Sequence, residues 1–207
     1  MLSRLPLAVA LALPVLIAQS PNGPTIPQVD DANPELLDLV IHDQWERGID
    51  MFGNRKTTMI DFEQLAKNDS HRLEIVRKML AGGNLQTGKD YRFAALVFQH
   101  SLTSTDYLLA HILAVTAVEK GDLKARWLAA ATMDRYLQSV GQAQVFGTQF
   151  SHPSGNDWSQ KEPYDRAAVS DSIRSAWCVV TQAEQDRILN DVREGKPFRS
   201  TSIAECK

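Results

Sequence analysis

Apolar residues recur three or four positions apart along most of the chain, which is the spacing of amphipathic α-helices. The clearest start is Asn33, an N-cap residue followed by proline, after which Leu36, Leu37 and Val40 share one face. We expect helices at residues 34–47, 60–80, 91–100, 103–120 and 123–140, and a last one after residue 181. No stretch alternates convincingly as a strand. The sequence therefore predicts an all-α fold.

Three features refine this expectation. The second helix is expected to break near residues 68–70, and Asp90 is expected to cap the third. The fourth is apolar on nearly every side, which is typical of a helix buried among others. Helices three to five are rich in alanine and have short joints, which favours closely packed antiparallel hairpins in a single domain.

The chain begins with the pattern of a signal peptide. Arg4 precedes an apolar run that ends at Ala18, and Ser20 supplies a small residue for a cleavage site. We expect residues 1–20 to be a signal peptide, 21–33 a flexible lead-in and 34–207 the helical domain of a periplasmic or secreted protein. The alternative is an uncleaved anchor, but the run is short for a membrane span and is broken by proline. We expect no stable span after cleavage.

Charge and cysteine content restrict the partners. The net charge is −3 and no basic run exists, which argues against nucleic acid. In an oxidising compartment Cys178 and Cys206, the only two cysteines, either pair or remain as a buried Cys178 and a free terminal Cys206. No metal-ligand spacing or phosphate-binding loop is present, so we expect neither a metal nor a cofactor. The sequence indicates no oligomeric state.

The most distinctive segment couples a charged pair to a turn rich in glycine and amide side chains. Its polar and glycine residues are Asp134, Arg135, Gly141, Gln144, Gly147, Thr148 and Gln149. The segment resembles the signature of a family of uncharacterised bacterial proteins, roughly L-A-Y-L-x-D-R and then G-x-x-Q-x-Y-G-T-Q. Gln99 and His100 also match that family's pattern. The chain departs from it at residues 130–133 and at Phe146, where the family has tyrosine. The family's chemistry is unassigned, so the resemblance implies no reaction.

Topology predicts where these residues meet. If helices three, four and five run up, down and up, then His100, residues 103–106, Asp134, Arg135 and the turn at 144–149 share one end of the bundle. A helix start favours an anion there, because its N–H groups are free and its dipole end is positive. Arg135 could offer a forked donor to the same group.

We therefore expect a binding module for a small molecule or peptide, with a polar pocket at this end. The expected ligand-binding residues are Gln99, Arg135, Gln144, Thr148 and Gln149. The alternative function is a small hydrolase or transferase, in which His100 is the general base and Asp134 orients it, with Arg135 beside them.

Each of these residues also has a structural interpretation. His100 can be a core-edge imidazole bonded to a backbone carbonyl, and Asp134 can cap the backbone of Gly147 and Thr148 or pair with an arginine. On the first helix, the charged residues from His42 to Arg47 are typical of a solvated face or of pairing within the helix.

Overall fold

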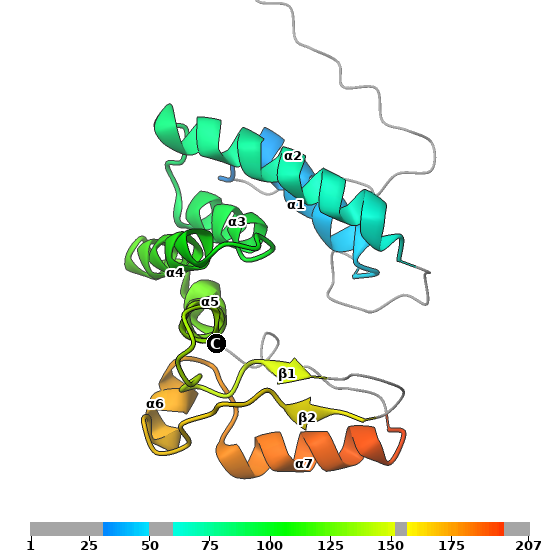
Figure 1. The fold of residues 1–207 in the computed structure, drawn as a ribbon. Coiled ribbons are helices and arrows are strands. Elements are labelled where there is room, and N and C mark those ends of the chain that lie inside the picture. Colours follow the sequence, from blue (N-terminus) through cyan, green and yellow to red (C-terminus); the bar gives the residue numbers. More distant parts are fainter. Residues whose placement is uncertain (1–30, 50–59, 152–156, 197–207) are drawn as a thin grey trace, which may run out of the picture.

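The computed structural model describes residues 31–49, 60–151 and 157–196. These ranges are mostly helical, which confirms the all-α prediction (Figure 1). The elements in order are α1 (Pro34–Glu46), α2 (Phe62–Ala81), α3 (Gly88–Phe98), α4 (Ser104–Glu119), the 3-10 helix η1 (Leu123–Ala125), α5 (Arg126–Ser139), β1 (Phe150–Ser151), β2 (Ser159–Gln160), α6 (Asp171–Ala176) and α7 (Gln182–Arg193).

Helices α3, α4 and α5 alternate in direction and form an antiparallel stack at the centre of the fold. The start of α3 lies against the end of α4, since a Cβ added at Gly88 would be 3.0 Å from the carbonyl oxygen of Ala117. The start of α4 meets the end of α5, where Ser104 Oγ lies 3.5 Å from the carbonyl oxygen of Ser139. Alanine lets the helices approach closely, as at the fully buried Ala114. The short joints thus produce the predicted antiparallel hairpins.

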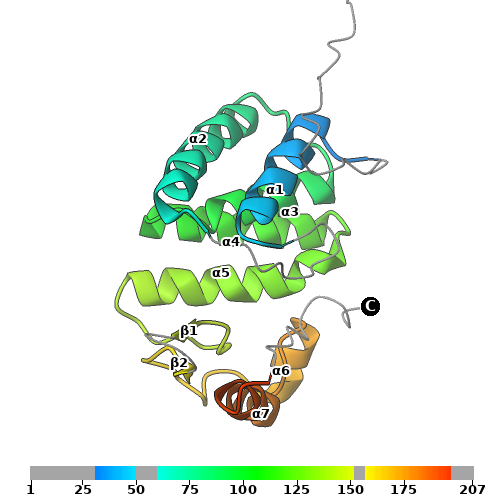
Figure 2. The same ribbon diagram turned by 90° about the vertical axis from the view of Figure 1, so that its right-hand side faces the viewer.

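Helices α1 and α2 pack together and cover one side of α3 (Figure 2). The apolar face of α1 is buried through Leu36, Leu37 and Val40. At its start, Asn33 Oδ1 accepts hydrogen bonds from the N–H groups of Glu35 and Leu36, as expected of an N-cap. On the other side of the stack, β1, β2, α6 and α7 lie beyond α5 (Figure 1). There β1 and β2 form a two-residue antiparallel pair.

Two local expectations were wrong, and one helix was missed. Helix α2 is unbroken through residues 68–70, because Asp69 bonds to Arg47 of α1 and thereby offsets its poor helix propensity. Helix α3 starts earlier than predicted, because Thr87 is its N-cap and Asp90 is the third residue of a reciprocal capping box. The short helix α6 was not predicted.

The fourth helix is not enclosed on all sides. Only the faces toward α3 and α5 are buried, whereas Ile112 and Val115 keep 51% and 40% of their surfaces exposed. The prediction that α4 is buried on all sides was therefore wrong, although apolar residues lie on every side of it. Its small residues, Ala110 and Ala114 among them, form the buried contacts.

Some predictions concern parts of the chain outside the described residues. The expected signal peptide and most of the lead-in lie there, as does Cys206. Cys178 is disulfide-bonded, and no described cysteine is a free thiol, which favours the paired alternative. Within the described ranges, no helix is both long enough and apolar enough to cross a bilayer.

Candidate functional site

The carboxylate of Asp134 holds the turn that follows α5. Asp134 is fully buried, and its Oδ1 accepts hydrogen bonds from the N–H groups of Val145 (2.8 Å) and Phe146 (3.0 Å). Its Oδ2 accepts from the N–H (2.9 Å) and the hydroxyl (2.7 Å) of Thr148. Both oxygens are thus used by the turn, which is the structural interpretation of Asp134.

The two glutamines of the signature bond to the same turn. Gln144 is fully buried, and its Nε2 donates to the carbonyl oxygens of Gln149 (3.0 Å) and Lys161. Its Oε1 accepts from the N–H of Gln149 at 3.0 Å. Gln149 in turn donates to the carbonyl oxygen of Ala131 (3.2 Å) and to the Thr148 hydroxyl (3.0 Å). These amides stabilise backbone that would otherwise lack partners.

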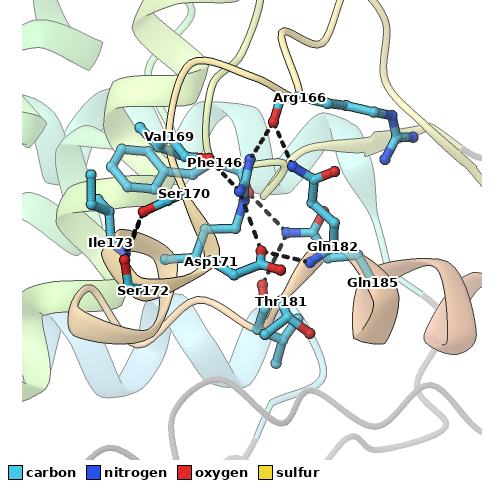
Figure 3. Close-up of polar contacts among 12 residues, drawn as sticks. Phe146, Arg166, Val169, Ser170, Asp171, Ser172, Ile173, Thr181, Gln182 and Gln185 are labelled. Carbon is cyan, nitrogen blue, oxygen red and sulfur yellow. Dashed lines mark hydrogen bonds and ion pairs between the residues drawn. The ribbon is translucent and has the colours of Figure 1, made fainter.

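Gly147 allows the turn to pack against the C-terminal part of the chain. Its φ is +78°, and an added Cβ would lie 2.5 Å from Oε1 of Gln185 and 2.6 Å from Oη of Tyr164. Gln185 reaches back from α7 and donates to the carbonyl oxygen of Phe146 at 2.8 Å (Figure 3). Only glycine fits this position without strain.

A buried arginine completes this polar region. Arg174 has no exposed side-chain surface, and its guanidinium donates to the carbonyl oxygens of Val145, Arg166 and Val169 and to the Tyr164 hydroxyl. In Figure 3 the carbonyl oxygen of Arg166 also accepts a hydrogen bond from Gln182 of α7. The turn at residues 144–149, with Tyr164, Arg174 and Gln185, is therefore a lock that joins α5 to the C-terminal helices through hydrogen bonds made within the fold. Within it, Nε of Arg174 is buried without a hydrogen-bond partner.

His100 lies elsewhere, just after the end of α3. Its Nε2 is 3.4 Å from Oδ2 of Asp43 on α1, and 17% of its side chain is exposed. Burial lowers the pKa of His100, and the nearby positive charges of Arg47 and Arg135 lower it further, while Asp43 opposes the shift. The net effect is a pKa below the ordinary 6.5, which favours a neutral imidazole at neutral pH.

Asp43 is the centre of an ion network between α1 and α2. It is 1% exposed and forms an ion pair with Arg47 at 2.9 Å, while Arg72 of α2 lies 3.5 Å away. Burial alone would raise the pKa of Asp43, but His100 and the two arginines hold it below its usual value. The arginines are themselves shared with Asp69, at 2.7 Å from Arg47 and 3.2 Å from Arg72. The charged residues from His42 to Arg47 were predicted to be solvated or paired within the helix. Asp43 and Arg47 do pair four residues apart and His42 is exposed, but Asp43 is buried.

Arg135 projects from α5 into the neighbourhood of these groups. Its Nε is buried and makes no hydrogen bond. Burial lowers its pKa, the positive charge of Arg47 lowers it further, and only Tyr107 of α4 acts in the opposite direction. Among the described residues, no carboxylate forms an ion pair with Arg135. Its charge is therefore enclosed but not neutralised.

Together these side chains form what we call the junction cluster: Asp43, Arg47, His100, Tyr107 and Arg135. They come from the end of α1, the residue pair after α3, the first turns of α4 and the last turns of α5. The first turn of α4 already carries a buried carboxylate of its own, Asp106, which accepts hydrogen bonds from Arg77 and Ser101.

The structure divides the predicted site residues into two groups. His100 and Arg135 belong to the junction cluster, whereas Gln144, Thr148 and Gln149 belong to the lock. The predicted pairing of His100 with Asp134 does not form, because the turn takes both oxygens of Asp134 and His100 faces Asp43 instead. Gln99 is 7% exposed at the end of α3, where its N–H caps the helix.

Sequence reasoning did not assign Asp43, Arg47 or Tyr107 to the site. Asp43 and Arg47 have the spacing of an ordinary pair on a helix surface, and this is also the spacing of a pair buried by a second helix. The signal that could have found Tyr107 is its place in the first turn of α4, four residues after Thr103.

No described group of acidic, histidine or cysteine side chains is arranged to hold a metal ion. Comparison of the chain with family models, with curated proteins and with solved structures found no match. The resemblance to the uncharacterised family therefore stays a prediction, and the junction cluster is the feature from which a function can be inferred.

The depressed pKa of His100 predicts a loss of stability in mild acid. The unfolded chain takes up a proton near pH 6.5 and the folded chain resists it, so stability is complete above that pH and falls as the pH is lowered through it. We expect the free energy of unfolding, measured with urea, to decrease between about pH 7.5 and about pH 5.5. His100→Gln should weaken this dependence, whereas His42→Gln, at a side chain that is 47% exposed, should keep it. Identical pH profiles for wild type and His100→Gln would contradict the assignment.

Proposed function

We propose that this protein is an exported helical module that binds a small polar ligand at the junction cluster. The observation that carries the proposal is the half-buried side chain of Arg135, whose Nε is buried without a hydrogen bond and which has no carboxylate partner among the described residues. An enclosed charge lacking a partner is costly, and proteins usually pair such groups. A ligand that supplies the missing acceptor would remove that cost on binding.

Three further features support binding at this place. His100, Tyr107 and Arg135 are each only partly buried, so the cluster reaches the surface. They come from separate elements, which are held by the antiparallel stack, and a rigid scaffold preorganises a site. The lock at 144–149 fixes the end of α5 and thereby the backbone that carries Arg135.

Binding is favoured over catalysis by the surroundings of His100. A general base acts on a nucleophile or a water within hydrogen-bond reach. Among the described residues, no hydroxyl or thiol hydrogen-bonds to His100, whose nearest charged partner is Asp43. Binding is therefore a simpler function than catalysis for this arrangement.

A thermal-shift screen of the full chain with mixed polar metabolites tests the proposal, because a ligand raises the melting temperature by mass action. We expect at least one hit whose shift is lost in Tyr107→Phe or His100→Ala and kept in Gln142→Ala, an exposed position of the turn after α5. A screen without such a hit would count against binding at the junction cluster.

Export is a separate part of the proposal and is motivated by Arg4 and the apolar run that follows it. Mass spectrometry should find a mature chain that begins between Gln19 and Pro24. An intact Met1 in the soluble fraction would contradict export.

A further inference from the structure

We propose that the ligand of the junction cluster carries an oxyanion, a carboxylate or phosphate group, and that Arg135 receives it. This inference rests on the proposed function and narrows it to one chemical class. The shared chemistry is a pair of negatively charged oxygens, which a guanidinium can bind through two parallel N–H groups.

The other enclosed arginines show how unusual Arg135 is in this structure. The side chains of Arg47, Arg72 and Arg174 are 15%, 6% and 0% exposed. Arg47 and Arg72 pair with carboxylates, and Arg174 is surrounded by backbone carbonyl oxygens. A buried Nε without a hydrogen bond is common to Arg72, Arg135 and Arg174. What sets Arg135 apart among the described residues is that its guanidinium has neither a carboxylate nor a carbonyl acceptor, and only the side chain of Tyr107 bonds to it.

The charge of Arg135 favours an anion over a neutral ligand. Arg47 and His100 lie close enough for their charges to interact with that of Arg135. The carboxylates of this region, Asp43, Glu46 and Asp69, pair with Arg47 and Arg72 and not with Arg135. An incoming oxyanion would therefore be attracted by Arg135 itself, and partial burial would strengthen the attraction.

His100 should make this binding depend on pH. The charged groups that face it are Asp43 and Arg47 from α1 and Arg135 from α5, while Tyr107 of α4 faces Arg135. An anion bound at Arg135 would offset the positive charges that disfavour the imidazolium, so binding and protonation of His100 favour each other. Affinity should therefore rise as the pH falls.

Calorimetric titration of the full chain with matched acids and amides tests the ligand class. The pairs are benzoate with benzamide, and N-acetylglycine with its amide; inorganic phosphate is the third arm. Benzoate represents organic acids, N-acetylglycine a peptide C-terminus, and phosphate the tetrahedral oxyanions. We expect at least one oxyanion to bind in the millimolar range or more tightly, and the corresponding amide not to bind.

Substitutions then locate the binding. Arg135→Gln should weaken oxyanion binding about 10- to 100-fold, because a charge-assisted hydrogen-bond pair is lost. Arg135→Lys should recover only part of it, because an ammonium lacks the fork. Arg187→Gln removes the same charge from α7, where the side chain is 60% exposed, and should leave binding unchanged. His100→Gln should reduce the gain in benzoate affinity between about pH 7.5 and about pH 5.5.

The stability of the ligand-free variants separates this role from a structural one. If the role of Arg135 is to bind a ligand, Arg135→Met removes an unpaired charge and should leave the melting temperature unchanged or raise it. If Arg135 is structural, the same variant should melt at a lower temperature. Oxyanion binding unaffected by Arg135→Gln, or no oxyanion binding at all, would overturn the inference. A neutral ligand that is lost in Tyr107→Phe but kept in Arg135→Gln would overturn it while leaving the proposed function intact.

Discussion

Replacement of Asp134 by alanine should lower the free energy of unfolding by about 3–5 kcal/mol. The carboxylate is fully buried and accepts four hydrogen bonds from Val145, Phe146 and Thr148. Its removal leaves three peptide N–H groups and one hydroxyl without an acceptor, in a place that water reaches poorly. Urea denaturation followed by circular dichroism measures the loss.

Two variants serve as controls for this prediction. Asp134→Asn keeps the shape of the side chain and one of its two acceptor oxygens, so the free energy of unfolding should fall by less, about 1–3 kcal/mol. Asp186→Ala removes a carboxylate whose side chain is 58% exposed, at 3.6 Å from Arg166, and should change stability by about 0.5 kcal/mol or less. If Asp134 served His100 in catalysis instead, Asp134→Asn would abolish an activity at nearly wild-type stability, and that result would contradict the structural role.

The parts of the fold that the sequence predicted correctly are set by local chemistry. Asn33 and Pro34 start α1, and Thr103 starts α4, because an N-cap and its N–H partners lie within three residues. Helix α2 was misjudged at residues 68–70, because its continuity depends on bonds to Arg47 and Glu46 of another helix. Such bonds join residues more than twenty positions apart, and no local sequence pattern predicts them.

The candidate site was predicted unevenly for the same reason. The density of polar residues at 144–149 correctly marked an unusual turn, but whether such groups face a ligand or one another depends on packing. His100 and Arg135 were correctly expected at one end of the bundle, since topology alone brings them there. The carboxylate beside His100 was misassigned to Asp134, because Asp43 becomes buried only when α1 and α2 close over it.

Alanine at Gly147 should destabilise the fold about as strongly as the loss of Asp134. Two separate costs add at this position. The backbone has a φ of +78°, which costs a residue with a Cβ about 1–2 kcal/mol. The new Cβ would also lie 2.5 Å from Gln185 and 2.6 Å from Tyr164, and overpacking of that kind costs about 1–3 kcal/mol. We expect a total of about 2–5 kcal/mol in urea denaturation.

Gly141 provides the matched control, because it separates backbone strain from crowding. Its φ of +76° is nearly the same, but nothing lies within 4 Å of an added Cβ. Gly141→Ala should therefore cost only the conformational part, about 1–2 kcal/mol. Equal losses for the two variants would mean that the turn does not pack against α7 as described. A larger loss at Gly147 places the difference in its contact with Tyr164 and Gln185, and so in the lock that holds the end of α5 and Arg135 in position.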